Sequence, residues 1–420
     1  MRVLRIDSWE GDSGGGQVYV RSVSDALNAL GHPQRVLNLV PRTPDATQPD
    51  EQFVRTGPTA RQRLVADLGA DTAFERAFHE AVRTFEPDLV HLHRFDVMFT
   101  PIARALSAVN IPVVFTAHDA ELVCPISTLI LPDGAVCEGG VRPRCMFTGC
   151  RVGGGGPYNL WQRRVFDRQL APKISAFLCP STLLTTYLHR HGYRPAVHLP
   201  PFARIPDAVR AGPYPPTRSD TPPTVGYLGR LEPYKGIQDL LRAVALLAPN
   251  EPGVRLTIAG DGPFRRALEH QAHSLGITDR VTWRGDLRGA EKEEWFRSID
   301  VLAVPSSAWE NFGLVALEAL TRGRPVVATA FGGLPDIVQD RETGRLVPVA
   351  DPPALAEALA DVLADKERAA TWAEAGRRRC LVRFTPEVHV ERLLAVYRSV
   401  LDHRSLGSPV EAVTLVGPPS

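Results

Sequence analysis

The sequence predicts an α/β protein built from two doubly wound domains, each with a parallel sheet covered by helices. Three observations lead to this prediction. The chain has 420 residues, which is too long for a single hydrophobic core. Short apolar runs alternate with helical stretches in both halves, as in parallel strands joined by crossover helices. Residues 201–223 are rich in proline and poor in periodic apolar residues, which indicates an extended linker between the halves.

The first half, residues 1–200, begins with a strand and continues as an alternation of helices and strands. A helix is predicted at 17–30, because apolar residues recur there at helical spacing. The strands are predicted from short apolar runs. These runs are RVLRID at 2–7, QRVLNL at 34–39, DLVHLH at 88–93, PVVFTAH at 112–118 and AFLCPS at 176–181.

The second half, residues 224–383, repeats this alternation. Strands are predicted at 224–230, 254–260, 281–285, 301–306 and 325–329, and helices at 236–248, 263–275, 289–298 and 312–322. Ligands of such sheets bind beyond the carboxyl ends of the strands, so a site is expected in the loops there. The amphipathic stretch 384–404 is expected to form a helix that packs back on the first domain, and 405–420 is expected to be a loose tail.

The composition argues against two classes of partner. The chain carries 48 basic and 47 acidic residues, so its net charge of +1 creates no global field for nucleic acid or an anionic membrane. The N-terminal segment lacks the apolar run of a signal peptide, and no segment approaches the length of a transmembrane helix. We therefore expect a cytoplasmic protein; peripheral contact with a membrane through a local patch stays open.

The most informative stretch, residues 303–347, places two carboxylates near the start of a helix. Glu310 lies just before the helix and Glu318 lies within it, among residues that are apolar almost all round. A carboxylate in such a place is costly to bury unless something binds it, and the hydroxyls of a sugar can do so. The free N–H groups at the helix start would suit a phosphate. The alternative is that Glu310 only favours the helix dipole and Glu318 reaches water.

Two cations follow the first strand of the second half. The segment GYLGRLEPYKG places Arg230 at the end of the strand and Lys235 in the next loop. Both residues could grip a diphosphate, arginine through two N–H groups and lysine as a point charge. The alternative is a solvated surface pair. Lysine is rare in this chain, with only Lys173, Lys235, Lys292 and Lys366, which favours a functional role for Lys235.

In the first half, GDSGGGQVYV places Gly14, Gly15 and Gly16 between a strand and a helix. Without side chains, this backbone could approach a ligand closely, although a plain turn is the alternative. His118 ends a later strand and is followed by Asp119, whose role stays open. In DLVHLH the two histidines alternate on a strand and share a face; a metal pair is possible, but packing or a role on the acceptor side is favoured.

Taken together, the motifs GRLEPYKG, AGDGP, ENFGLVALEAL, GRPVVAT and GGLPDIV resemble those of the retaining glycosyltransferases of family 4. The resemblance extends over nearly the whole chain. It implies the GT-B fold, in which two Rossmann-like domains face a central cleft. It also implies a nucleoside-diphosphate-sugar donor held mainly by the second domain and a hydroxyl-bearing acceptor held mainly by the first. Asn311 and Asp336 depart from the family pattern, which has glycine and glutamate there.

Carried over to this sequence, the resemblance assigns donor-binding roles to Gly15, Gly16, Arg230, Lys235, Arg284, Glu310, Phe312, Gly313, Leu314 and Glu318, and catalytic roles to Glu310, His118, Arg230 and Lys235. Glu310 would face the hydroxyls of the donor sugar and Glu318 those of the ribose. Arg230 and Lys235 would neutralise the leaving diphosphate. Arg284 would line the base pocket, and His118 would lie near the transferred sugar.

The family resemblance further implies attack from the face that the leaving group occupies, with the acceptor proton passing to a phosphate oxygen of the donor. No two aspartates lie one residue apart, so the usual divalent-metal grip on a diphosphate is missing, and we expect no cofactor to be required for catalysis. The acceptor could be a small metabolite or natural product, or a glycan or lipid carrier. The rival hypotheses are an epimerase on the same fold and a non-catalytic sugar-binding protein.

Four of the six cysteines fall within one loop-like insertion, residues 120–156. They are Cys124, Cys137, Cys145 and Cys150. In a cytoplasmic protein this grouping suggests a structural zinc ion, although the intervals are not those of a standard zinc ribbon. Free thiols and disulfides are the alternatives, and disulfides would need an oxidising compartment.

Overall fold

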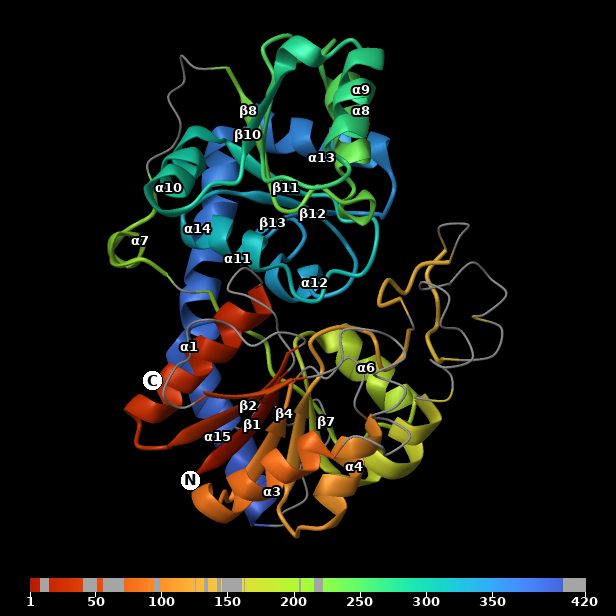
Figure 1. Ribbon diagram of the computed structural model, residues 1–420. Helices are drawn as coiled ribbons and strands as arrows, with labels where there is room; N and C mark the ends of the chain where they lie inside the picture. The colour runs from red at the N-terminus through yellow and green to blue at the C-terminus, as the bar shows by residue number, and fades with distance from the viewer. Residues whose placement is uncertain are drawn as a thin grey trace. The chain divides into compact units, whose positions relative to one another are not determined.

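The computed structural model divides into two compact units, Met1–Pro200 with Pro386–Ser420, and Pro201–Thr385 (Figure 1). The structure describes residues 1–7, 15–40, 51–55, 72–93, 99–124, 126–131, 135–141, 145, 161, 163–203, 205–214 and 222–402. Each unit contains its own sheet and its own core. Within the described part of the chain, no helix combines the length and the apolar character that a bilayer crossing requires.

The sheet of the first unit has seven parallel strands in the order β3-β2-β1-β4-β5-β6-β7. Its strands are β1 (Val3–Asp7), β2 (Gln34–Val40), β3 (Glu51–Arg55), β4 (Leu89–Leu92), β5 (Val113–Thr116), β6 (Ile174–Cys179) and β7 (Ala196–His198). The central strands β1, β4 and β5 are buried along their whole length, as expected for a parallel sheet covered on both faces.

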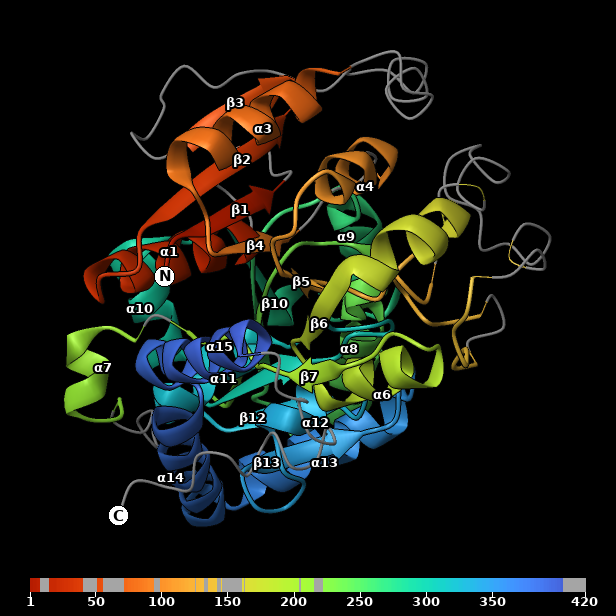
Figure 2. The same ribbon diagram turned by 90° about the horizontal axis from the view of Figure 1, so that it is seen from below.

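Helices cover both faces of this sheet (Figure 2). Helices α1 (Gly15–Ala29) and α15 (Pro386–Leu401) pack against each other on one face, and α3 (Ala73–Phe85) and α4 (Phe99–Ser107) pack together on the other. The first unit also contains α6 (Thr182–Arg190) and the short helical turns Phe166–Leu170 and Ala171–Lys173. The last helix of the chain therefore belongs to the first unit: the Tyr397 hydroxyl on α15 lies 2.6 Å from Nδ1 of His91 on β4.

The sheet of the second unit has six parallel strands in the order β10-β9-β8-β11-β12-β13. They are β8 (Thr224–Leu228), β9 (Arg255–Ala259), β10 (Val281–Gly285), β11 (Val301–Val304), β12 (Val326–Thr329) and β13 (Gly344–Val347). Chain order reverses between β8 and β11, because β9 and β10 extend the sheet on one side of β8 and β11 to β13 extend it on the other.

Two apolar clusters, one on each face, hold this second sheet. One cluster joins the strands to α8 (Ile237–Leu247), α9 (Arg265–Ser274) and α13 (Pro352–Ala364). The other joins them to α10 (Gly289–Ser298), α11 (Leu314–Thr321), α12 (Leu334–Ile337) and α14 (Lys366–Arg383). Short 3-10 turns at Pro233–Lys235 and Thr278–Arg280 complete the unit.

The α/β class and the doubly wound sheets are confirmed, and each predicted strand lies where an apolar run predicts it. Three strands, β3, β7 and β13, were not predicted. All three are at the edge of a sheet, where one side lacks a neighbouring strand, and β7 has only three residues. The predicted extended linker contains a five-residue helix, α7 (Asp207–Ala211), so it is not extended over these residues.

Candidate functional site

The candidate site of the second unit lies where chain order reverses in the sheet. The loops after β8 and β11 leave two adjacent parallel strands and lead to helices on opposite faces of the sheet. Such a point opens a crevice at the carboxyl edge of the sheet, where ligands of doubly wound proteins bind. Lys235 is on the loop after β8, and Glu310 is on the loop after β11.

These two side chains meet. Lys235 Nζ donates to Glu310 Oε2 at 2.7 Å, and Ser306 Oγ donates to the same oxygen at 2.9 Å. The side chains are 25% and 16% exposed, so the pair is mostly shielded but reachable from solvent. Burial by itself would lower the pKa of Lys235, but the neighbouring Glu310 carboxylate outweighs burial, and the pKa of Lys235 is raised. The ammonium is therefore held charged.

Two glycines allow the loops around this pair to pack closely. Gly236 follows Lys235 with φ of +73°, and a Cβ there would lie 1.8 Å from the Pro305 carbonyl oxygen. Gly332, in the loop after β12, has φ of +68°, and a Cβ would lie 2.1 Å from the Glu310 carbonyl oxygen. The next N–H, that of Gly333, donates to this same carbonyl at 2.7 Å. Only glycine fits such positions, so the Gly-Gly turn fixes the backbone of Glu310.

Glu318 is on α11 and pairs with a lysine that the sequence analysis did not single out. Lys292 Nζ, on α10, lies 2.8 Å from Glu318 Oε1 and 2.7 Å from Oε2. Both side chains are about a quarter exposed, 25% and 23%. A cation beside Glu318 accounts for a carboxylate in a helix whose other faces are apolar. The rarity of lysine in the chain was a signal for this residue, but nothing in the sequence indicated its partner.

Helix α11 starts two residues after the predicted start at 312. Gly313 precedes the helix with φ of +98°, and Leu314 is its first residue. Phe312 is 3% exposed, with its ring 5.4 Å from that of Phe384 in a T-shaped contact. The Phe312 side chain is thus part of the core, so at this residue only the backbone is available to a ligand.

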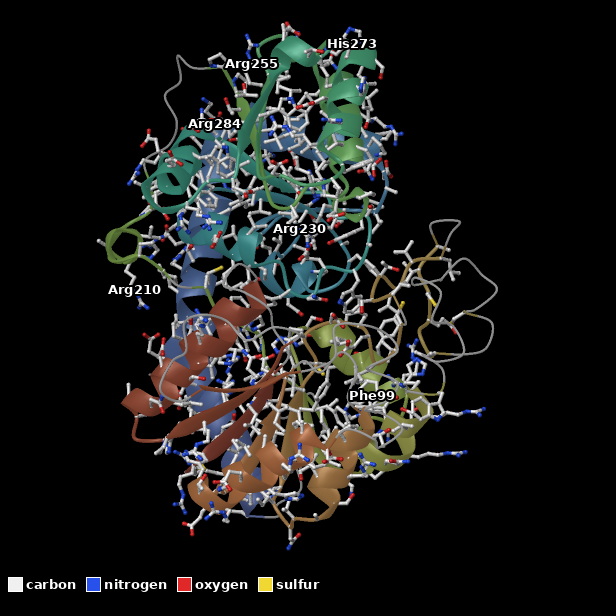
Figure 3. All side chains as sticks on the ribbon, in the orientation of Figure 1. Phe99, Arg210, Arg230, Arg255, His273 and Arg284 are labelled. Atoms are coloured by element: carbon white, nitrogen blue, oxygen red, sulfur yellow. The ribbon has the colours of Figure 1, made fainter. Side chains whose placement is uncertain are left out.

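Arg230 and Arg284 stand apart from these pairs. The Arg230 side chain is 73% exposed and pairs with Glu232 of its own loop at 2.7 Å. Its carbonyl accepts from the buried Tyr227 hydroxyl at 3.0 Å, which anchors the backbone while the side chain stays in solvent. Arg284 is exposed on β10, an edge strand. In Figure 3, Arg255 at the start of β9 lies near the top of this unit, and Arg230, after the end of β8, lies well below it.

In the first unit, Gly15 and Gly16 open α1, while Gly14 falls outside the described residues. His118 follows β5 and is half-buried. Its Nε2 lies 3.0 Å from Nδ1 of His93, and His93 Nε2 accepts from Arg5. Arg5 is completely buried, and the sequence analysis did not single it out.

His91 is on β4 and His93 directly follows the strand, and both rings are occupied by contacts with other residues. His91 uses both ring nitrogens, with Tyr397 at 2.6 Å and Thr116 at 2.7 Å. His93 uses both of its own, with Arg5 and His118. Across the described ranges, no three histidine, cysteine or acidic residues are grouped to hold a metal ion. These contacts support the packing interpretation.

Three of the four clustered cysteines are described, and Cys150 lies outside the described residues. Cys124, Cys137 and Cys145 are free thiols, and Cys124 is buried, which raises its pKa. The segment around Cys137 docks on α6, because its carbonyl accepts from the Tyr187 hydroxyl at 2.8 Å. The zinc interpretation depends partly on Cys150 and stays a prediction.

A pair of doubly wound parallel sheets, with a cation and a carboxylate meeting at the switch point of the second, defines the class of GT-B glycosyltransferases. Comparison with known families agrees with this class. The family described as "Glycosyl transferases group 1" matches residues 215–379, and "Glycosyltransferase Family 4" matches residues 13–203. The chain belongs to glycosyltransferase family 4.

Similar curated proteins carry the name D-inositol 3-phosphate glycosyltransferase. The protein of Segniliparus rotundus is 38% identical over 193 residues, which are 45% of this chain and 42% of the relative. That of Streptomyces coelicolor is 42% identical over 144 residues, which are 32% of this chain and 31% of the relative. The chain thus spans less than half the length of these relatives.

Solved structures with the same fold match nearly the whole chain. Sucrose-phosphate synthase from Thermosynechococcus elongatus gives a TM-score of 0.71 at 24% identity and covers 96% of this chain and 100% of its own. Anabaena HepE in complex with UDP gives a TM-score of 0.66 at 20% identity, with 95% and 100% covered. These likenesses confirm the GT-B fold.

Proposed function

We propose that the protein is a retaining glycosyltransferase that moves a sugar from a nucleoside-diphosphate sugar to an acceptor hydroxyl. The observation that supports this most directly is the contact between Lys235 and Glu310 at the switch point of the second sheet. A diphosphate needs a cation, and sugar hydroxyls need an acceptor. This contact puts both within a few ångströms of each other, on loops fixed by glycine turns.

The donor would displace the contact between the two side chains. Lys235, and Arg230 by rotation of its exposed side chain, would bind the diphosphate, while Glu310 would accept hydrogen bonds from the sugar. Glu318 would accept from the ribose hydroxyls, with Lys292 beside it. HepE, solved in complexes with UDP and with UDP-glucose, supports a donor of this class.

In the reaction, the bond between the anomeric carbon and the diphosphate oxygen breaks, and a bond from the acceptor oxygen to the same face of that carbon forms. The acceptor proton passes to a phosphate oxygen of the departing diphosphate. Lys235 and Arg230 stabilise the charge that develops on this leaving group.

The acceptor is proposed to be a small, polar, hydroxyl-bearing molecule. The relatives named for D-inositol 3-phosphate support such an acceptor over a glycan or lipid carrier. Their name and the family also favour transfer over the rival hypotheses of an epimerase and a binding protein.

The test has two stages. Thermal unfolding is followed with UDP, GDP, ADP and dTDP, and the nucleotide that raises the Tm identifies the base. The matching UDP-, GDP-, ADP- or dTDP-sugars are then incubated with and without inositol phosphates and other polyols, and products are followed by NMR. Transfer that requires an acceptor and retains anomeric configuration supports the proposal. Turnover of donor alone to an epimer, or binding without turnover, contradicts it.

A further inference from the structure

We propose that Arg5 sets the tautomer of His118 through His93, so that the His118 ring offers its Nδ1–H, and not Nε2–H, as a hydrogen-bond donor to the ligand. Arg5 and His93 are then positioning residues for the reaction. The proposed role of this donor toward sugar or phosphate oxygens rests on the function proposed above. The tautomer itself does not depend on that function.

The three side chains lie in a row on one face of the first sheet. Arg5 on β1 pairs in register with His91 on β4, and His91 pairs with Val114 on β5. Side chains alternate along a strand, so His93, two residues after His91, and His118, four after Val114, project from the same face as Arg5. Helices α1 and α15 cover this face, through Val20 and Tyr397.

Arg5 is fully buried, and each of its nitrogens donates. Nε donates to His93 Nε2 at 3.0 Å, and Nη2 lies 2.7 Å from the same ring nitrogen. Nη1 donates to the Val20 carbonyl at 2.9 Å and to Ser24 Oγ at 2.5 Å. No carboxylate in the described part of the chain forms an ion pair with Arg5. Its neutral partners therefore replace a counter-ion.

The direction of the hydrogen bonds follows from chemistry. A guanidinium has donors but no acceptor, so His93 Nε2 must carry the lone pair and its Nδ1 must carry the proton. His93 Nδ1 lies 3.0 Å from His118 Nε2, which must then accept. A histidine that accepts at Nε2 carries its proton on Nδ1. Arg5 therefore donates to His93, and His93 donates to the half-buried ring of His118.

The surroundings keep His93 neutral, as this order requires. Burial, together with the nearby His91 and Arg5, holds the pKa of His93 well below its usual value. His91 is fixed separately by Tyr397 and Thr116, and His389 by Tyr19 and a backbone carbonyl, so neither competes for His93. A second proton on His93 would point at the guanidinium and is excluded by charge.

The chemical value of the fixed tautomer is selectivity for acceptor atoms. A ring locked with Nδ1–H can donate to a sugar hydroxyl oxygen or a phosphate oxygen without becoming charged. An unconstrained imidazole would divide between two tautomers and present a lone pair for part of the time. A neutral donor aimed by a buried cation is preorganised, and removing such a donor typically costs about 10²–10³ in rate.

The direct test is long-range ¹H–¹⁵N NMR of the full chain with ¹⁵N-labelled histidine at neutral pH. His118→Asn and His93→Asn spectra assign the two rings. We expect protonated-type shifts at Nδ1 and unprotonated-type shifts at Nε2 for both rings in the wild-type protein. In Arg5→Met the His118 signals should become an average of tautomers, and Arg5→Lys, which keeps a donor-only cation, should restore them at least partly. An Nε2–H tautomer or an imidazolium at His118 in the wild-type protein overturns the proposal.

Kinetics test the consequence. Arg5→Met should lower kcat by at least about tenfold, less than the loss of about 10²–10³ for a donor removed outright, because the averaged ring still donates for part of the time. The nucleotide Kd should change less than about twofold, because Lys235 and Glu318, which are proposed to bind the diphosphate and the ribose, are in the other unit. Arg2→Met, the same change at a half-exposed arginine just before the same strand, is the matched control and should leave kcat unchanged. An Arg5→Met protein that folds and keeps full kcat would refute the positioning role. If no donor is turned over by the wild type, the proposed function fails, and the NMR result still decides the tautomer.

Discussion

Replacing Glu310 by glutamine should strengthen binding of free UDP, or of whichever nucleoside diphosphate proves to be bound, while abolishing most transfer. The unusual sign comes from the contact between Glu310 and Lys235 at 2.7 Å. Without ligand, this carboxylate occupies the ammonium that the diphosphate needs. A nucleoside diphosphate has no sugar to satisfy Glu310, so it must compete with the carboxylate for Lys235 and also lie close to a like charge.

The magnitude follows from the exposure of the pair. The side chains are 25% and 16% exposed, which places the pair between an exposed one, worth about 0.2–1 kcal/mol, and a buried one. Removing the competition should therefore gain about 1 kcal/mol, or about a fivefold lower Kd for the nucleoside diphosphate. Transfer should fall by about 10²–10³, because the sugar hydroxyls lose an ionised acceptor as the transition state forms.

Isothermal titration calorimetry with the nucleoside diphosphate measures the gain, and an NMR assay of transfer measures the loss. Glu318→Gln is the matched control, since it removes the other paired carboxylate, which is proposed to bind ribose. Its Kd should rise, not fall. Lys235→Met should weaken binding in either background. A Kd for the nucleoside diphosphate that is equal or higher in Glu310→Gln would refute the idea that Glu310 competes with the diphosphate for Lys235.

Three further predictions follow from separate features. Gly332→Ala should lower the free energy of unfolding by more than about 2 kcal/mol, because a Cβ would lie 2.1 Å from a backbone oxygen. Gly276→Ala is the control: φ there is +66° and nothing lies within 4 Å of the Cβ, so only backbone strain of about 1–2 kcal/mol is expected. Urea denaturation of both variants distinguishes the cost of the steric clash from the cost of the backbone strain. Burial lowers the pKa of His389 to about 4 and those of His91 and His93 well below normal, so the unfolded state binds more protons than the folded state at acidic pH. The stability contribution of these histidines is complete above about pH 6.5, and each should lose about 1.4 kcal/mol per pH unit as the pH falls from there towards 4. Urea titrations at pH 7, 6 and 5 that show no fall in the free energy of unfolding would contradict this. Finally, protein purified under reducing conditions should contain about one zinc ion per chain if the cysteine cluster binds metal; elemental analysis without zinc, together with four titratable thiols in the cluster, would end that interpretation.

Most of the fold could be predicted from the sequence because its central strands are continuous apolar runs. Such runs signal strands that are buried on both faces, and β1, β4, β5, β8, β9, β11 and β12 were found this way. The strands that were missed give a different signal. EQFVR, AVH and GRLV are short, and EQFVR and GRLV each carry arginine; all three pair on only one side. An edge strand needs less apolar surface, so its sequence resembles a loop.

The residues of the candidate site were predictable where the local sequence contains the reason. Glu310 lies just before a helix start, and two consecutive glycines indicate a close approach of backbone segments. The partner of each charge was not predictable. Lys292 and Glu318 are 26 residues apart, and Lys235 and Glu310 are 75 apart. Their contacts arise only when the order of strands brings helix α10 beside α11 and the loop after β8 beside the loop after β11.

The contacts of Arg5 could not be predicted from the local sequence. In the sequence it is one arginine among many, within a strand whose other residues are typical of a core. Strand order places β4 between β1 and β5, and this order alone aligns Arg5, His93 and His118. Burial of a cation among neutral groups would cost several kcal/mol if its donors were unused. The chain retains it with every nitrogen engaged, and the same bonds that satisfy this cation determine where the last histidine carries its proton.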